Sequence, residues 1–408
     1  MMSTYNLSST PFVKKMQTLG VALLAVGAVG LGSMAAAGLD NLYAGYILGF
    51  MYVTGISVTL LFFSTLTFLA NAGWAVAIRR IAELLSGNVK FGVPLFLIPL
   101  AVMAPQMYKW WAPDGHLAHL MDHSFKGLYL DHTFFYARLA FYVLFWWMMH
   151  SFIVGNSIKQ DTASDIEPTK RNWKRAAPFI IGYAVTITFI AFDLLMSLEP
   201  EWFSTIFGVY YFAGNFVSTA SIMLIFVNIL NKDGLLKGVI SREHYHDLGK
   251  LMFAFTVFWA YIAFSQYYII WYGNMPEETF YYAKRLQGGW EVFGWSSLFI
   301  HFFVPFLFLL RQDVKRNPAL VKIGAFLILF AHFIDLSWVV LPVFGGAHGE
   351  VSHFTPQLLV AGISGVLLMG GVFLIAGAQQ FKKHPAVAYN DPYMYESLEY
   401  HSGSYDRA

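Results

Sequence analysis

Cysteine is absent from this chain of 408 residues. Without thiolates the chain cannot ligate an iron–sulfur cluster, attach a c-type haem through a Cys-x-x-Cys-His motif, form a disulfide or use a thiol nucleophile. Any redox centre that works with this protein must therefore belong to a partner or be held by histidine.

Charged residues are also scarce, at 12% of the chain, whereas 57% of the residues are hydrophobic. A soluble domain of this size would need a very large exposed apolar surface to carry that composition, so the sequence indicates an integral membrane protein. The net charge of +2 gives no indication of a nucleic-acid partner. Hydrolytic motifs, phosphate-binding loops and dinucleotide fingerprints are missing as well, which argues against chemistry on soluble substrates.

Apolar runs of the length needed to cross a bilayer, roughly 20 residues, occur about ten times. We expect spans at 16–37, 42–70, 91–108, 132–156, 177–198, 204–230, 250–272, 290–310, 320–343 and 355–380. The first span follows Lys14 and Lys15 and ends in a run of alanines, as in a signal peptide, but we interpret it as a retained helix. The amphipathic stretch before the third span, which contains Arg79, Arg80 and Glu83, is expected to lie at the inner surface.

Basic residues are unevenly distributed between the two sets of loops. All but five of the 26 Lys and Arg residues fall on the side of the two termini. The exceptions are Lys109, Lys126, Lys284 and Arg285 in opposite loops, and Arg138 inside a span. By the positive-inside rule, both termini are expected to be cytoplasmic.

The predicted fold class is an all-α integral membrane protein with two four-helix bundles, formed by spans two to five and six to nine, plus peripheral helices. Residues 1–380 would form the membrane domain and residues 381–408 a polar cytoplasmic tail. The tail has no apolar period, so we expect it to be extended, either disordered or laid over a neighbouring subunit.

Ionisable residues inside apolar spans are costly and usually mark a proton, ion or substrate path. Arg138 and Asp193 both fall roughly 10 Å below the outer boundary at 1.5 Å per residue, so they are able to pair. One interpretation is a structural salt bridge that joins two helices. The other is a proton-loading or quinone-headgroup site near the outer face.

A second polar group is predicted in the middle of the membrane. His301 and His332 reach similar depths, and Asp335 shares a helix face with His332 at i, i+3. A carboxylate hydrogen-bonded to an imidazole holds or passes a proton near neutral pH, but a satisfied buried pair without a transport role is the alternative. His150, near the inner end of the fourth span, fits an interfacial histidine better than a functional one. Bulky aromatic neighbours favour packing over haem b at the histidine pair.

The outer loop between the third and fourth spans contains three histidines and a carboxylate that would coordinate zinc if the loop were helical. They are His116, His119 and His123, with Asp122. No fourth ligand is assured by the sequence, so a solvated or partner-facing loop is the favoured interpretation. We expect neither a metal nor a cofactor bound by this chain.

Two segments carry a resemblance to a known family. FDLLMSLEPEWFSTIFGVYYFAGNF at 192–216 and HDLGKLMFAFTVFWAYIAFSQYYIIWYGNMPEET at 246–279, together with the ten-span layout, resemble the smaller polysulfide-reductase-type (NrfD-like) membrane subunit of bacterial alternative complex III. That complex is a quinol:cytochrome c, or quinol:electron-acceptor, oxidoreductase. The resemblance covers nearly the whole chain.

The resemblance implies a set of partners in the bacterial inner membrane. They are a larger NrfD-like quinol-binding paralogue, multihaem and monohaem c-type cytochrome subunits, an iron–sulfur subunit and a terminal oxidase. Quinol would be the substrate of the complex, and the haems and clusters would lie in the partners. The smaller subunit of this family is thought to carry a proton path, which assigns Asp193 and Glu199, with Arg138 opposite, to its outer part. His301, His332 and Asp335 rest on the reasoning from depth alone.

Four hypotheses follow for the function. The first is an energy-coupling subunit that moves protons when its partners oxidise quinol. The second is a quinol pocket in this chain near Arg138, Asp193 and Glu199, since quinol oxidation needs a proton acceptor. The third is a redox-silent scaffold that anchors the haem and cluster subunits. The fourth, a free-standing ion-coupled transporter, lacks the interrupted helices expected of one.

Overall fold

The computed structural model describes residues 7–8, 10–122, 124–346 and 352–401, and all regular structure in these ranges is helical. Ten segments are long and apolar enough to cross a membrane, so the chain is a multi-pass membrane protein. These segments are Pro11–Ala37, Leu39–Leu69, Gly73–Met107, His132–Gln160, Glu167–Leu198, Phe207–Lys232, Arg242–Gly273, Glu291–Leu310, Pro318–Val343 and Pro356–Lys383. The ten predicted spans are confirmed. Several begin up to ten residues earlier than predicted, because their first turns are polar and lie outside the apolar window. The third begins 18 residues earlier, because it includes the amphipathic stretch with Arg79, Arg80 and Glu83.

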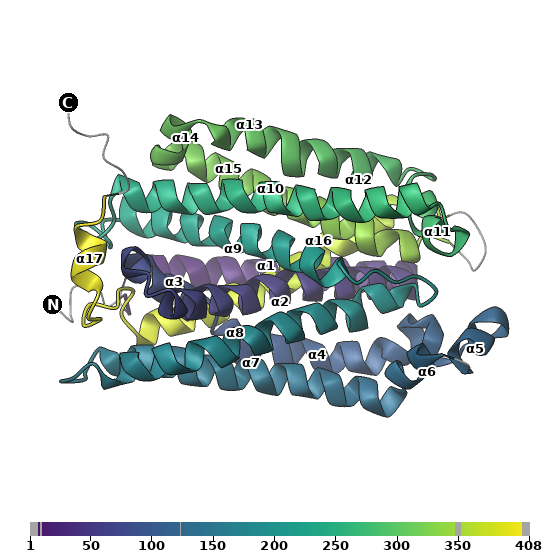
Figure 1. Ribbon diagram of the computed structural model, residues 1–408, viewed down its shortest axis with the longest axis horizontal. Coiled ribbons are helices and arrows are strands. Elements are labelled where there is room, and N and C mark those ends of the chain that lie inside the picture. Colours follow the sequence, from purple (N-terminus) through teal and green to yellow (C-terminus); the bar gives the residue numbers. More distant parts are fainter. Residues whose placement is uncertain (1–6, 9, 123, 347–351, 402–408) are drawn as a thin grey trace.

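The helices form two four-helix bundles, as predicted (Figure 1). The first bundle consists of α2 (Leu39–Leu69), α3 with α4 (Val76–Leu85 and Asn88–Met107), α7 (His132–Gln160) and α8 (Glu167–Leu194). The second consists of α9 (Phe207–Lys232), α10 (Arg242–Gly273), the segment α12–η4–α13 (Glu291–Ser296, Ser297–Phe303 and Val304–Leu310) and α15 (Pro318–Val340). The bundles meet where α2 packs against α9, and both of these helices are almost entirely buried.

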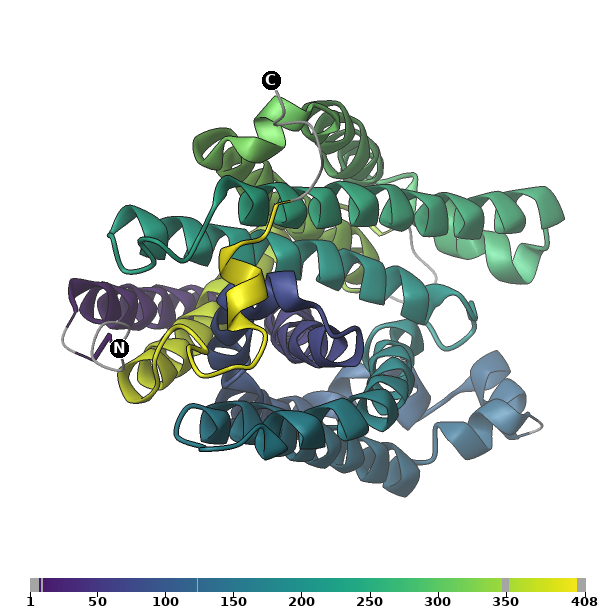
Figure 2. The same ribbon diagram turned by 60° about the vertical axis from the view of Figure 1, so that its left-hand side comes forward.

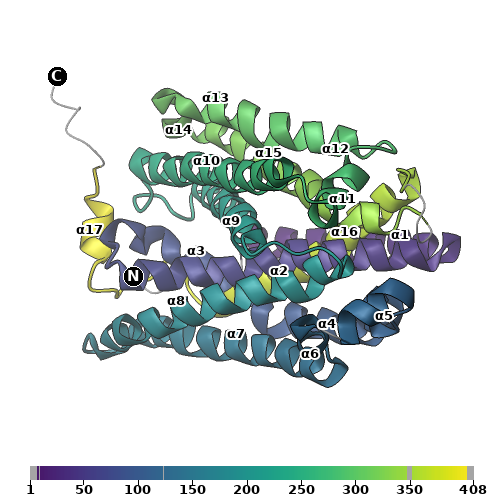
Figure 3. The ribbon, with the colours of Figure 1, turned by 45° about the vertical axis from the view of Figure 1, so that its right-hand side comes forward.

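Two peripheral helices, α1 (Pro11–Ala37) and α16 (Pro356–Lys383), pack on each other and against α2, alongside the bundles (Figure 3). Their contacts are made through glycines. A Cβ added at Gly49 of α2 would overlap the backbone of Gly365 in α16, and one at Gly365 would overlap the carbonyl oxygen of Gly45. Close backbone approach through small residues is the usual way in which membrane helices associate, because lipid gives no hydrophobic driving force between them.

Short helices lie at both ends of the bundles. α1 begins and α16 ends at the same end, which we call the inner end; the opposite end is the outer end (Figure 1). The outer end bears η2 (Lys109–Trp111), α5 (Gly115–Asp122), α6 (Phe125–Tyr129), η3 (Met196–Leu198), α11 (Pro276–Arg285) and η5 (Leu341–Val343). The inner end bears η1 (Gly73–Ala75), α14 (Gln312–Arg316) and α17 (Met394–Leu398).

The polar tail folds back on the chain's own inner end (Figure 2). Residues 384–400, which we call the strap, include α17 and run across α3. Ala386, Val387 and Ser397 are fully buried there. The expectation of a disordered tail, or one laid over a neighbour, is therefore wrong for residues 384–400. It failed because the strap is held by scattered polar side chains and small apolar residues, which leave no periodic signal.

Candidate functional site

A cavity of about 370 Å³ lies near the outer end of the second bundle. Its lining includes the aromatic residues Tyr210, Trp259, Tyr281, Tyr282, Trp295 and Trp338. Two further lining residues show where it opens: Phe264 of α10 is 64% exposed and Leu298 of η4 is 38% exposed, on a side that faces lipid in a membrane. The cavity therefore has a lateral, apolar entrance between α10 and η4.

Asp335 of α15 is the single carboxylate among the described residues that line the cavity, and it is 2% exposed. The Tyr210 hydroxyl donates a hydrogen bond to Oδ1, and Trp259 Nε1 donates one to Oδ2 at 3.2 Å. Among the described residues no Lys or Arg forms an ion pair with Asp335. The predicted hydrogen bond to His332 is wrong, because His332 Nδ1 lies 4.0 Å from Oδ2. The two residues do share one face of α15, as their i, i+3 spacing predicts.

His301 and His332 lie side by side behind the cavity, as their depths predicted, with ring centroids 6.1 Å apart. Trp259 stacks on the His301 ring at 3.9 Å, and Tyr52 lies against the His332 ring at 5.3 Å. Neither nitrogen of either ring has a hydrogen-bond partner within the described chain. Buried polar groups are rarely left unpaired, so we expect these ring nitrogens to bind water or another donor or acceptor.

The helix segment that carries His301 is unusual. Residues Ser297–Phe303 form a π-helix, η4, between the α-helical turns α12 and α13. Ser297 lines the cavity, and its hydroxyl is buried without a partner among the described residues. π-Helical turns cluster at functional sites. The sequence analysis did not predict this one.

The predicted ion pair between Arg138 and Asp193 is present in the first bundle. Arg138 Nη2 donates to Asp193 Oδ1 at 2.9 Å, and Arg138 Nε lies 3.0 Å from Oδ2. Tyr142 donates its hydroxyl proton to Oδ2 at 2.7 Å. Asp193 is completely buried, and the Arg138 guanidinium lies over the Tyr129 ring at 4.0 Å. Each oxygen of this carboxylate thus has a donor, and its charge is balanced.

The two aspartates occupy equivalent places in the sequence, which the sequence analysis overlooked. Both begin an Asp-Leu pair that is followed by proline seven residues after the aspartate, at Pro200 and Pro342. Both lie near the outer end of the last helix of their bundle, ahead of a 3₁₀ turn. The difference between them is chemical: Asp193 is paired with a guanidinium, whereas Asp335 has only neutral donors and faces a cavity.

Glu199, which was predicted to lie with Asp193 and Arg138 on the outer part of one path, has its ion pairs with other residues. It lies beyond η3, where Arg285 Nη1 contacts Oε2 at 2.6 Å and Lys284 Nζ contacts Oε1 at 3.0 Å. Burial opposes ionisation of the carboxyl, but the two cations of α11 outweigh it and hold the pKa of Glu199 below its ordinary value. Glu199 thus fastens α11 to the loop that follows η3.

The Glu199 cluster gives a pH prediction. Because the pKa of Glu199 is lowered in the folded chain, its stabilisation is present above the unfolded value and is lost as the pH falls through the folded pKa. We expect Glu199→Gln to lower the free energy of unfolding by about 2 kcal/mol near neutral pH, with the difference from wild type shrinking in acid. Detergent-solubilised protein unfolded at several pH values measures this. Glu201→Gln, at an exposed neighbour, is the control and should show no such pH-dependent difference.

The remaining predicted candidates lie apart from these sites. His150 is buried in α7, and its ring nitrogens have no hydrogen-bond partner within the described chain. His116, His119 and Asp122 lie in α5, whereas His123 falls outside the described residues. Within the described ranges, no group of three or more potential ligands is placed to hold a metal.

Comparison with known proteins does not assign the chain to a family. No protein-family model matches it, and no curated protein sequence matches it. Support for a function therefore comes from the resemblance carried by segments 192–216 and 246–279 and from the geometry of the second bundle.

Proposed function

We propose that the chain is a membrane subunit of a quinol:electron-acceptor oxidoreductase of the alternative complex III type, and that it handles protons inside the membrane when partner subunits oxidise quinol. The observation that carries this proposal is Asp335, a buried carboxylate with neutral donors that lines a cavity. The resemblance implies that its partners are the larger quinol-binding paralogue, the haem and iron–sulfur subunits and the terminal oxidase. It also implies a location in the bacterial inner membrane, and the distribution of basic residues predicts that both termini are cytoplasmic.

Asp335 is suited to a proton-loading role because its charge is not neutralised by a fixed cation. Asp193, by contrast, is held by the Arg138 guanidinium, which balances its charge. Asp335 keeps only two neutral hydrogen bonds, so a proton arriving from the cavity is able to bind its oxygens. His332 Nδ1, at 4.0 Å, is close enough for a small side-chain movement to bring it into hydrogen-bond range, and His301 lies next to His332.

The test compares the two equivalent aspartates in the intact complex. Asp335→Asn keeps the shape of the side chain but removes its ability to exchange a proton, so we expect fewer protons released per electron and slower turnover, by about tenfold. Asp193→Asn is the matched variant, and we expect the proton-to-electron ratio to stay unchanged. An unaltered ratio in Asp335→Asn would leave the chain as a scaffold for its partners.

A second candidate function is favoured by the cavity itself. Its aromatic lining, lateral opening and single carboxylate suit the head group of a quinol that enters from lipid, and quinol oxidation requires a proton acceptor such as Asp335. This candidate places the quinol pocket in the second bundle, whereas the sequence predicted it near Arg138, Asp193 and Glu199. A photoreactive quinone should label the cavity, and Ala263→Trp, at a small lining residue, should block that labelling. Labelling confined to the larger paralogue would reject this candidate.

A further inference from the structure

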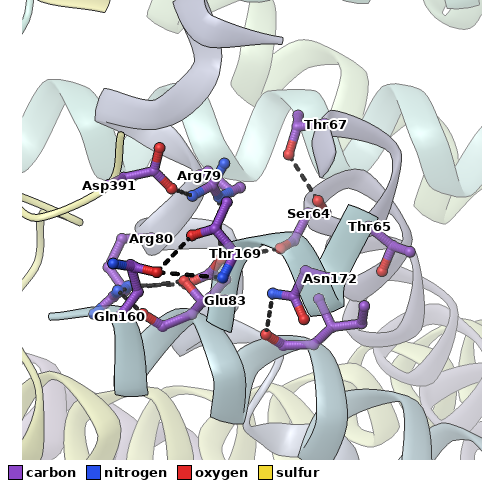
Figure 4. Close-up of polar contacts among 12 residues, drawn as sticks. Ser64, Thr65, Thr67, Arg79, Arg80, Glu83, Gln160, Thr169, Asn172 and Asp391 are labelled. Atoms are coloured by element: carbon purple, nitrogen blue, oxygen red, sulfur yellow. Dashed lines mark hydrogen bonds and ion pairs between the residues drawn. The ribbon is translucent and has the colours of Figure 1, made fainter. Parts of the chain in front are cut away.

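Five charged side chains are buried together at the inner end of the first bundle, and all of them except Asp161 are labelled in Figure 4. They are Arg79, Arg80, Glu83, Asp161 and Asp391. Glu83 is the centre of this inner cluster: Arg79 Nε contacts its Oε1 at 3.2 Å, and Arg80 Nε contacts its Oε2 at 2.8 Å. Arg80 also binds both oxygens of Asp161. This amphipathic stretch lies at the inner end, where the strap covers it and its charged side chains are buried.

The strap supplies one of the three carboxylates of the inner cluster. Asp391 Oδ2 accepts from Arg79 Nη2 at 2.5 Å, and beside it Asn390 Nδ2 donates to the backbone oxygens of Gln160 and Ala163. A small pocket of about 10 Å³, enough for about one water molecule, is lined by both residues of this ion pair. The strap thus covers the charged side chains at the inner end of the first bundle.

Behind this cover, buried polar side chains continue through the first bundle. Ser64 of α2 donates to Glu83, and Thr59, about 7.5 Å further along α2 by helix rise, bonds to the hydroxyl of Tyr183 at 2.8 Å. Trp146 then donates to Thr186 at 2.9 Å, one turn before the Tyr142–Asp193 contact. We call this row, from Ser64 to Tyr142, the polar ladder. Its side chains are buried, and the strap lies across the inner end of the bundle that contains them.

Two features favour release of the strap: an excess of carboxylates in the inner cluster and the small amount of helix in the strap. The inner cluster contains three carboxylates for two guanidiniums, so one negative charge is not balanced. Consistent with this excess, burial and then repulsion from Glu83 and Asp391 raise the pKa of Asp161 above its ordinary value, although Arg80 opposes the shift. The strap contains only one helix, α17, of five residues, and Tyr395 on it is 67% exposed.

We propose that the strap is a releasable cover that controls the access of water, and with it protons, from the inner face to the polar ladder of the first bundle. This proposal rests on the proposed function in one respect, namely that the chain handles protons. It concerns a different bundle from Asp335.

The absence of native cysteine allows a direct test on the full chain in its native complex. Ser64→Cys places a nearly isosteric thiol beside Glu83, at a residue that is fully buried. With the strap in place, we expect this thiol to react slowly with a small, charged, membrane-impermeant thiosulfonate. With Asp391→Ala added, we expect reaction from the inner side to become about tenfold faster, the rate change for a barrier lowered by ~1.4 kcal/mol.

Three further variants make the test decisive. Tyr395→Ala, at an exposed strap residue, is the control and should leave the Ser64→Cys thiol protected. Deletion of residues 384–408 should expose the thiol as fully as Asp391→Ala does; if that chain fails to assemble, Asn390→Ala combined with Asp391→Ala removes the same anchors. Hydrogen exchange of the strap backbone confirms release. A released strap with an unchanged thiol rate, or a thiol that already reacts quickly in the intact chain, would overturn the proposal.

The outcome is separable from that of the proposed function. Thiol reactivity requires no quinol and no turnover, whereas the Asp335→Asn test measures protons per electron. A protected Ser64→Cys thiol after strap release would reject the cover and leave the role of Asp335 in place. An unchanged proton ratio in Asp335→Asn would do the reverse.

Discussion

Arg138→Met is expected to lower the free energy of unfolding by about 3–5 kcal/mol, the usual result of removing one partner from a buried ion pair. The variant leaves the Asp193 carboxylate fully buried with the Tyr142 hydroxyl as its side-chain donor. It also removes the hydrogen bond of 2.7 Å from Arg138 Nη1 to the Tyr129 carbonyl. Reversible unfolding in mixed micelles of mild detergent and dodecyl sulfate, followed by tryptophan fluorescence, measures the change.

The double variant Arg138→Met with Asp193→Leu separates a structural pair from a proton-loading one. Buried ion pairs replaced by apolar residues of similar volume are often neutral or more stable, so we expect the double variant to recover most of the lost stability. If the pair only joins α7 to α8, the recovered protein should also turn over normally in its complex. A stable double variant with lost proton release would instead place the first bundle on the proton path.

The residue pairs that the sequence predicted correctly are those matched by depth along the helix axis. Arg138 and Asp193 were matched by their distance from the outer boundary, and His301 and His332 by theirs, and the structure brings both pairs together. Hydrophobic span length fixes depth because the hydrocarbon thickness is fixed. This reasoning works where two polar residues lie on helices that are neighbours in the chain.

Which helices lie side by side could not be derived from the sequence. Asp335 receives its hydrogen bonds from Tyr210 on α9 and Trp259 on α10, both far from it in sequence. Hydropathy does not say which face of one span meets which face of another, since lipid-facing and protein-facing positions are both apolar. Glu199 was misplaced for the same reason, because its partners are on α11.

The strap was missed for a different physical reason. Its contacts with the rest of the chain are scattered hydrogen bonds, such as Tyr389 to the Asp161 carbonyl and Ser397 to the Trp74 carbonyl, one ion pair among the described residues, and a few small buried apolar residues. Polar composition predicts a solvated tail when such contacts are not visible. The informative signal was on the other side of the interface: the buried guanidiniums of Arg79 and Arg80 outnumber the carboxylate of their own helix, Glu83, and required further acidic partners.

Gly365 of α16 lies in the close glycine contact with α2. Gly365→Ala should destabilise the chain by about 1–3 kcal/mol, as overpacking of a close contact does, although alanine favours a helix over glycine by about 1 kcal/mol. The reason is that the new Cβ meets the carbonyl oxygen of Gly45, a backbone atom of α2 that cannot move aside without separating the helices. Gly45 and Gly49 form a Gly-x-x-x-Gly pair, which is the sequence signal for such a contact.

Gly370→Ala on the same helix is the matched control. A Cβ at Gly370 meets nothing within 4 Å among the described residues, so this variant gains the helix propensity of alanine without a clash and should be neutral or slightly more stable. Unfolding in the same mixed micelles compares the two variants. Equal stability of Gly365→Ala and Gly370→Ala would mean that α16 does not approach α2 as closely as the structure shows. Opposite signs would establish that backbone contact, and not helix propensity, holds the peripheral pair against the first bundle.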